Sequence, residues 1–173
     1  MIRHVQQTNP WNCGSAVVSM VTGVEISLIE DDYRSPAKIY SEEVGEMNDG
    51  FRCVGLALDE ISFLLFRYGI IHYQMALLEC CEKGGSVRAH PDVAADMGPD
   101  FIPDIETWIR RTALKGHATI TGVKSKLSGH WVVFYDEKIF DPLLPAPMAV
   151  SEIEQDQYVI DSQCLVCAPH GRH

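Results

Sequence analysis

Runs of apolar residues separated by polar turns set out the expected elements of this 173-residue chain. The first run, residues 14–22, predicts a helix that ends at Gly23, because glycine readily adopts the left-handed conformation found after helices. Residues 35–47 predict a second helix, since they open on a serine and a proline that suit a helix start. Residues 55–68 predict a third helix, in which apolar residues recur at helical spacing.

Strand patterns dominate the rest of the chain. β-Branched, aromatic and aliphatic residues are concentrated in five segments, which are 70–78, 117–124, 130–136, 138–141 and 157–168. A helix capped by Asp104 and ended by Gly116 is expected between the first two of these segments. Helices followed by closely spaced strands indicate an α+β fold with an antiparallel sheet in its second half. We expect a single domain that spans residues 1–173.

Residues 80–103 have little periodicity. They contain three glycines and three prolines, and connections of this length without secondary structure are uncommon in compact domains unless they serve a function. We expect this segment to border the functional groove and to contribute to specificity. A surface loop with no such role is the alternative.

Composition argues against two classes of partner. Asp and Glu total 24 against 14 Lys and Arg, a formal net charge of −10, which repels phosphate backbones and argues against a nucleic-acid partner. The longest apolar stretches, such as residues 61–66, fall far short of the roughly 20 residues that span a bilayer, so we expect no membrane segment. Residues 16–24 have the apolar character of a signal-peptide core, but Glu25 follows at once. We therefore expect a cytoplasmic protein.

The six cysteines lack the spacing of a small disulfide-stapled domain, and we expect reduced thiols. Cys164 and Cys167 precede two histidines, a combination also found in zinc sites. The two residues between neighbouring ligands leave too little chain to wrap around one ion, and the two cysteines have opposite parity on a strand. We expect buried cysteines in this segment, with no metal and no cofactor.

One cysteine has surroundings that suit a nucleophile. Cys13 stands between a polar loop and the first predicted helix, where the partial positive charge of a helix N-terminus lowers the pKa of a thiol. The alternative is that Cys13 is a small apolar residue at the start of a buried helix.

A base and a residue to orient it are also present. His130 begins one predicted strand and Asp141 ends the next, so a tight hairpin would return both to the same end of the sheet. His117 is a rival base, but no acid follows it across a hairpin. Asp136 is expected to be a turn residue.

These residues together resemble a known family. Gln7, "NCGSA" at residues 12–16, "GHWVV" at 129–133 and "FDP" at 140–142 occur in the order found in papain-like bacteriocin-processing peptidases, which remove double-glycine leaders. Residues 50–70 are similar to the family's segment in which a helix lies between two glycines. The resemblance covers most of the chain and implies a papain-like fold with a thiol peptidase site.

The resemblance also implies a role for each motif residue. Cys13 is then the nucleophile, and His130 is the base and later the acid. Asp141 orients His130, and Gln7 is an oxyanion donor beside the Cys13 backbone amide, since an amide side chain and a helix-start N–H are suitable donors. Gln6 is an adjacent rival for Gln7.

The expected function is hydrolysis of a peptide or isopeptide bond in a peptide or protein substrate through an acyl-enzyme intermediate. Acyl transfer or glutamine deamidation on the same fold is one alternative, and a non-catalytic peptide-binding module is another. Asn12 stands where the family usually has aspartate, so we assign it no catalytic role. Trp11 and Trp131 flank the predicted nucleophile and base, and the sequence leaves open whether they pack in the core or shield the His130–Asp141 pair.

Overall fold

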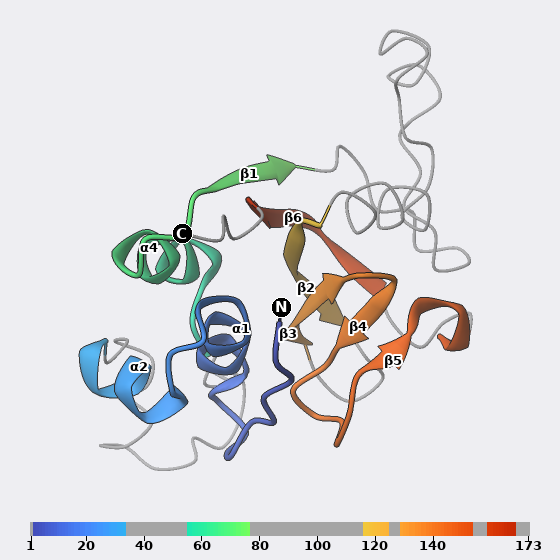
Figure 1. Cartoon of the computed structure of the whole chain (residues 1–173), viewed down its shortest axis with the longest axis horizontal. Helices are drawn as coiled ribbons and strands as arrows, with labels where there is room; N and C mark the ends of the chain where they lie inside the picture. Colours follow the sequence, from blue (N-terminus) through green and yellow to red (C-terminus); the bar gives the residue numbers. More distant parts are fainter. Residues whose placement is uncertain (1, 34–54, 77–115, 125–128, 154–158, 169–173) are drawn as a thin grey trace, which may run out of the picture.

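The computed structural model describes residues 2–33, 55–76, 116–124, 129–153 and 159–168 (Figure 1). These residues contain three α-helices, which are α1 (Cys13–Thr22), α2 (Ile26–Asp32) and α4 (Leu58–Arg67). They also contain a short 3₁₀ helix at Val150–Glu152 and six strands, which are β1 (His72–Ala76), β2 (Ala118–Lys124), β3 (Gly129–Tyr135), β4 (Lys138–Phe140), β5 (Met148–Ala149) and β6 (Val159–Cys167).

The six strands form one sheet in the order β1-β6-β2-β3-β4-β5, and each neighbouring pair is antiparallel. Figure 1 shows the three helices grouped beside the sheet, with α1 between the strands and the other two helices. The expected α+β class with an antiparallel sheet is therefore confirmed.

The helix α1 is buried along almost its whole length. Every residue from Cys13 to Val21 is buried, which agrees with the absence of charged residues from this run, since a helix surrounded by protein has no solvated face for them. Gly23 ends the helix with a φ of 76°, and its N–H bonds to the carbonyl of Ser19 at 2.8 Å. The predicted helix and its glycine end are both confirmed.

The predictions for the next two helices need correction. The helix α2 is not predicted from the sequence, because the short segment has a single buried residue, Ile29, and no apolar periodicity. The helix expected from residue 55 begins at Leu58 instead. Ala57 is extended, and its N–H donates to the Glu60 carboxylate at 2.7 Å, which fixes the helix start there. The helices expected at 35–47 and after Asp104, and the segment 80–103, lie outside the described residues.

The predicted strands are present, and the ends that fall within the described residues differ from the predicted ones by one or two residues. Residues 77–78 and 157–158 lie outside the described residues. The turn between β3 and β4 consists of Asp136 and Glu137, whose φ angles are 51° and 58°. Positive φ at both central residues is typical of the tight turns that match the twist of a hairpin. The predicted hairpin is thus confirmed, whereas the two-residue β5 has too few residues to give a pattern.

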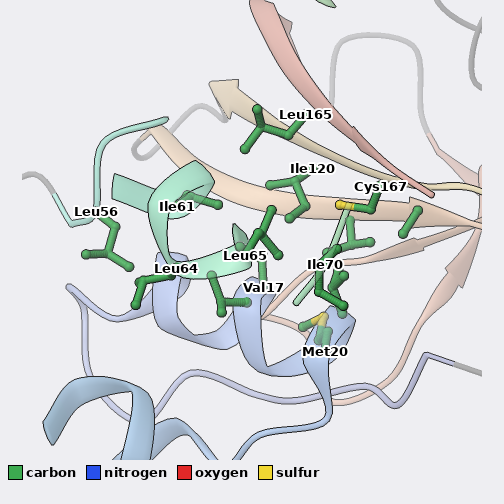
Figure 2. Close-up of a cluster of buried hydrophobic side chains, with 14 of the residues drawn as sticks. Val17, Met20, Leu56, Ile61, Leu64, Leu65, Ile70, Ile120, Leu165 and Cys167 are labelled. Carbon is green, nitrogen blue, oxygen red and sulfur yellow. The ribbon is translucent and has the colours of Figure 1, made fainter. Parts of the chain in front are cut away.

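The sheet separates two clusters of buried side chains. The larger cluster lies between the helices and one face of the sheet (Figure 2), where Val17 and Met20 of α1 and Ile61 and Leu65 of α4 pack with strand residues such as Leu165. Cys167 belongs to this cluster and Cys164 to the smaller one, with Val132 and Phe134. The two cysteines therefore lie on opposite faces of the sheet, as their parity on the strand predicts.

Within the described residues, no single helix is long and apolar enough to cross a membrane. The pair α1 and α2 passes the test of length and composition when taken together, but the two helices are bent by 113°.

The burial of Cys167 predicts a loss of stability at alkaline pH. Its side chain is 1% exposed, and burial raises the pKa of its thiol to about 12. The folded protein therefore keeps this thiol protonated while the unfolded chain ionises it, so the stabilisation is present below about pH 9 and is lost as the pH rises toward 12. Denaturant unfolding of wild type should show a fall of roughly 2 kcal/mol between pH 8 and 11 that Cys167→Val lacks. Parallel curves for the two proteins would contradict this prediction.

Candidate functional site

The β3–β4 hairpin places His130 next to Asp141. Val133 pairs with Phe140 across the hairpin, so the start of β3 and the residue after β4 lie at the same end of the sheet. His130 Nε2 and Asp141 Oδ2 are 3.1 Å apart, and the two side chains are 5% and 3% exposed. A carboxylate this deeply buried requires a hydrogen-bonded partner, because an isolated buried charge is costly.

The Asp141 contact assigns different roles to the two ring nitrogens of His130. An ionised carboxylate only accepts hydrogen bonds, so Nε2 carries a proton toward Asp141 and Nδ1 is the basic nitrogen. The second carboxylate oxygen, Oδ1, accepts the backbone N–H of Leu143 at 2.8 Å. Asp141 is thus held through both oxygens, and it fixes the orientation and tautomer of His130.

The Cys13 thiol lies at the start of both α1 and β3. It interacts with the backbone amides of Trp131, Gly14 and Cys13 itself, and Trp131 directly follows His130 in β3. The thiol is therefore close to the strand position that carries the candidate base.

The pKa of the Cys13 thiol changes in the direction opposite to the sequence-based expectation. Burial raises the pKa of the thiol above its usual range, and the negative charge of Asp141 raises it further, while the backbone amides act in the opposite direction. The expectation of a lowered pKa is therefore wrong for this buried state, because desolvation outweighs the amides at the helix start. A thiolate at Cys13 needs a proton acceptor or a cation beside it.

Asn12 holds the loop that leads into α1. Its Oδ1 accepts the backbone N–H groups of Thr8 and Asn9 at 3.2 and 3.3 Å, and its Nδ2 donates to the Thr8 hydroxyl at 2.9 Å. The side chain makes no capping bond to α1, so the first amides of the helix are left facing Cys13. Asn12 thus organises the loop, which agrees with giving it no catalytic role.

Gln7 and Gln6 differ in their surroundings. Gln7 is half-buried, and its Nε2 donates to the carbonyl of Asn9 at 3.0 Å, while its backbone N–H donates to the carbonyl of Pro142 at 3.0 Å. The Gln7 side chain is thus held on the loop before α1, and its backbone is fixed beside Asp141. Gln6 is exposed, so the structure favours Gln7 as the glutamine of the candidate site.

Gly55 and Leu56 pack closely against the start of α1 beside the Cys13 thiol, an approach that the sequence pattern does not reveal. A Cβ on Gly55 would lie 2.4 Å from the Trp11 carbonyl oxygen and 3.8 Å from Cys13 Sγ, and a Cβ on Gly14 would lie 2.7 Å from the Leu56 Cβ. Only glycine allows approaches this close. The signal in the sequence is the Gly55-Leu56 pair, which the helical spacing of residues 55–68 places at the start of a helix.

The rival residues lie elsewhere or have other roles. His117 precedes β2, whereas the partner of His130 across the strands is Val123, near the other end of β2. Six strand residues separate these two ends by about 20 Å, so His117 is remote from the site. Asp136 is in the hairpin turn, as predicted. Trp131 donates its indole N–H to the carbonyl of Leu56 at 2.7 Å and packs against the larger cluster.

In the described parts of the chain, no group of three or more His, Cys, Asp or Glu side chains has the arrangement of a metal site. Cys13, Cys164 and Cys167 do not form disulfides. The other three cysteines lie outside the described residues. No protein-family model matches this chain, and no curated protein matches it. The geometry of the site and its motifs are therefore the basis for a functional proposal.

The close approach at Gly55 gives a steric prediction. Gly55→Ala should displace the Trp11 carbonyl, two residues before Cys13, because its Cβ would meet that backbone oxygen at 2.4 Å. We expect a loss of about 1–3 kcal/mol in unfolding free energy and an altered rate of Cys13 alkylation by iodoacetamide, measured by mass spectrometry.

Gly129→Ala is the matched control, because a Cβ there would lie 3.8 Å from the Val123 carbonyl oxygen, an ordinary contact. Equal unfolding free energies and equal Cys13 alkylation rates in the two variants would show that the close approach of Gly55 does not constrain the site.

Proposed function

We propose that this protein is a papain-like cysteine peptidase that hydrolyses a peptide or isopeptide bond through an acyl-enzyme intermediate. The observation that carries this proposal is the buried 3.1 Å hydrogen bond between His130 Nε2 and Asp141 Oδ2 at the end of the sheet where α1 begins with Cys13. A nucleophile, a base and a group that orients the base are the three parts that such chemistry requires.

Acylation begins with transfer of the Cys13 thiol proton to His130 Nδ1. The sulfur then forms a bond to the substrate carbonyl carbon, and the carbonyl oxygen becomes an oxyanion. His130 returns the proton to the leaving nitrogen as the carbon–nitrogen bond breaks, and a thioester remains on Cys13. Asp141 supports both steps because its charge stabilises the imidazolium that forms in between.

The oxyanion needs donors that are fixed before the reaction. The backbone N–H of Cys13 is one such donor, since it lies at the start of a helix whose first amides have no side-chain cap. The second is the Nε2 amide of Gln7, which has two N–H bonds and uses one for Asn9. Donors aimed at a developing charge contribute more than those that bind the ground state.

Deacylation repeats the sequence with water in place of the thiol. His130 accepts a proton from water as the water oxygen bonds to the thioester carbon. The carbon–sulfur bond then breaks and His130 returns the proton to the sulfur, which gives a carboxylic acid and the Cys13 thiol. An amine in place of water would give acyl transfer, and analysis of the products by mass spectrometry distinguishes the two reactions.

One observation favours a second candidate, a non-catalytic peptide-binding module. The Cys13 side chain is 6% exposed and burial raises the pKa of its thiol, as in an inert core cysteine. The two candidates differ in whether His130 affects the reactivity of this thiol.

The peptidase proposal predicts that Cys13 alkylation at pH 7 depends on His130. His130→Ala should slow labelling of Cys13 by iodoacetamide about 10²-fold, because the base that removes the thiol proton is lost. In that variant the rate should keep rising above pH 9, since burial raises the pKa of the thiol. Site-resolved mass spectrometry across pH 6–11 measures both effects.

Cys13→Ala is the control for the identity of the labelled residue, and the buried Cys164 and Cys167 should stay unlabelled in folded protein. If wild type and His130→Ala are labelled at the same rate at pH 7, the peptidase proposal is wrong and the binding module is the better description.

The two glutamines give a second prediction with a built-in control. Gln7→Ala should lower the turnover of an N-acyl-glycine p-nitrophenyl ester by roughly 10²–10³-fold, because one oxyanion donor is lost. Gln6→Ala should leave turnover unchanged, since Gln6 is exposed. Far-UV circular dichroism checks that both variants are folded, and the opposite ranking would assign the role to Gln6.

A further inference from the structure

Residues 2–9 form an N-terminal strap that runs beside the loop carrying Asp141. Two hydrogen bonds fix it there: His4 Nε2 is 2.9 Å from the Leu144 carbonyl oxygen, and the Gln7 backbone N–H donates to the Pro142 carbonyl at 3.0 Å. Ile2 and Val5 pack against the larger cluster, and Figure 1 shows the strap between α1 and β3. The strap thus links the start of the chain to residues about 140 positions later.

The loop after β4 transmits this contact to the Asp141 carboxylate. Leu143 donates its N–H to Asp141 Oδ1 at 2.8 Å, and Leu144 donates its N–H to the Asp141 carbonyl at 3.0 Å. The flanking residues Pro142 and Leu144 offer their carbonyls to the strap. Residues 142–144 therefore contact the strap through two carbonyls and Asp141 through two amides.

The contact of His4 with Leu144 fixes which of its two ring nitrogens donates a hydrogen bond. A carbonyl oxygen only accepts, so Nε2 of His4 carries the proton and donates it to Leu144. The other ring nitrogen, Nδ1, is buried and has no hydrogen-bond partner within the described residues. The ring also lies near Phe140, with the ring centroids 6.3 Å apart. His4 is thus held against the end of β4 rather than extended into solvent.

We propose that His4 is a positioning residue for the candidate site: it holds the Leu144 carbonyl, and thereby fixes the loop through which the Leu143 amide orients Asp141 against His130. This inference rests on the proposed function, since it gives His4 a role in the reactivity of Cys13. His4 does not touch the reacting atoms and acts only through Asp141.

Replacement of His4 by glutamine or by asparagine separates the effect of its hydrogen-bond donor from the effect of its size. The amide nitrogen of glutamine reaches the position of histidine Nε2, whereas that of asparagine reaches only the position of Nδ1. His4→Gln should therefore keep the rate of Cys13 alkylation by iodoacetamide at pH 7 within about twofold of wild type. His4→Asn and His4→Ala should lower that rate roughly tenfold, as expected for a small displacement of a catalytic group.

The His130 ring gives a readout that a merely structural role would not change. Nitrogen-15 NMR of the imidazole should show a protonated Nε2 and an unprotonated Nδ1 in wild type and in His4→Gln. In folded His4→Asn this pattern should be averaged between tautomers, because the loop whose Leu143 amide orients Asp141 is no longer fixed by His4. Thermal unfolding of each variant identifies those that are folded.

The outcomes distinguish the two proposals. If Cys13 alkylation depends on His130 but all His4 variants behave as wild type, the positioning role is wrong and the peptidase proposal stands. If alkylation is independent of His130 while the His130 spectrum still changes in His4→Asn, the peptidase proposal fails and the strap still orients the pair. If only wild type and His4→Gln fold, a tenfold loss in His4→Gln overturns the positioning role, and an unchanged rate and spectrum support it.

Discussion

The burial of α1 against the sheet is the constraint on which the rest of the site depends. It brings the first residue of the helix to the start of β3. Gly14 and Gly55 allow residues 55 and 56 to pack closely against this end of the helix. The same burial removes water from the Cys13 thiol and disfavours its ionised form. The charge of Asp141 acts in the same direction on Cys13, since it also opposes a thiolate there.

The features that the sequence predicts have strong local signals. The run that becomes α1 is predominantly apolar, has no charged residue and ends at a glycine, so a buried helix is its simplest interpretation. The β3–β4 hairpin has two alternating segments around a two-residue turn, and this local geometry alone brings His130 to Asp141. The α+β class follows from the same patterns.

The features that it does not predict depend on residues far apart in the chain. The short helix α2 has one buried residue, and Gly55 and Leu56, which were expected in a helix, lie instead against Trp11 and Gly14. The contact of His4 with Leu144 spans 140 positions, for which one sequence offers no pairing signal. The sign of the Cys13 pKa change also depends on burial from several elements, whereas the sequence shows only the helix start.

The turn at Asp136 and Glu137 limits how the chain can vary in length. Side chains alternate between the two faces of a strand, so a single residue added to or removed from either strand of the hairpin would turn Asp141 away from His130. Length changes between these two residues must then come in pairs or be absorbed as bulges. In homologous chains, a conserved interval of ten residues between the histidine and the aspartate is thus a better marker of this site than the identity of the residues within the interval.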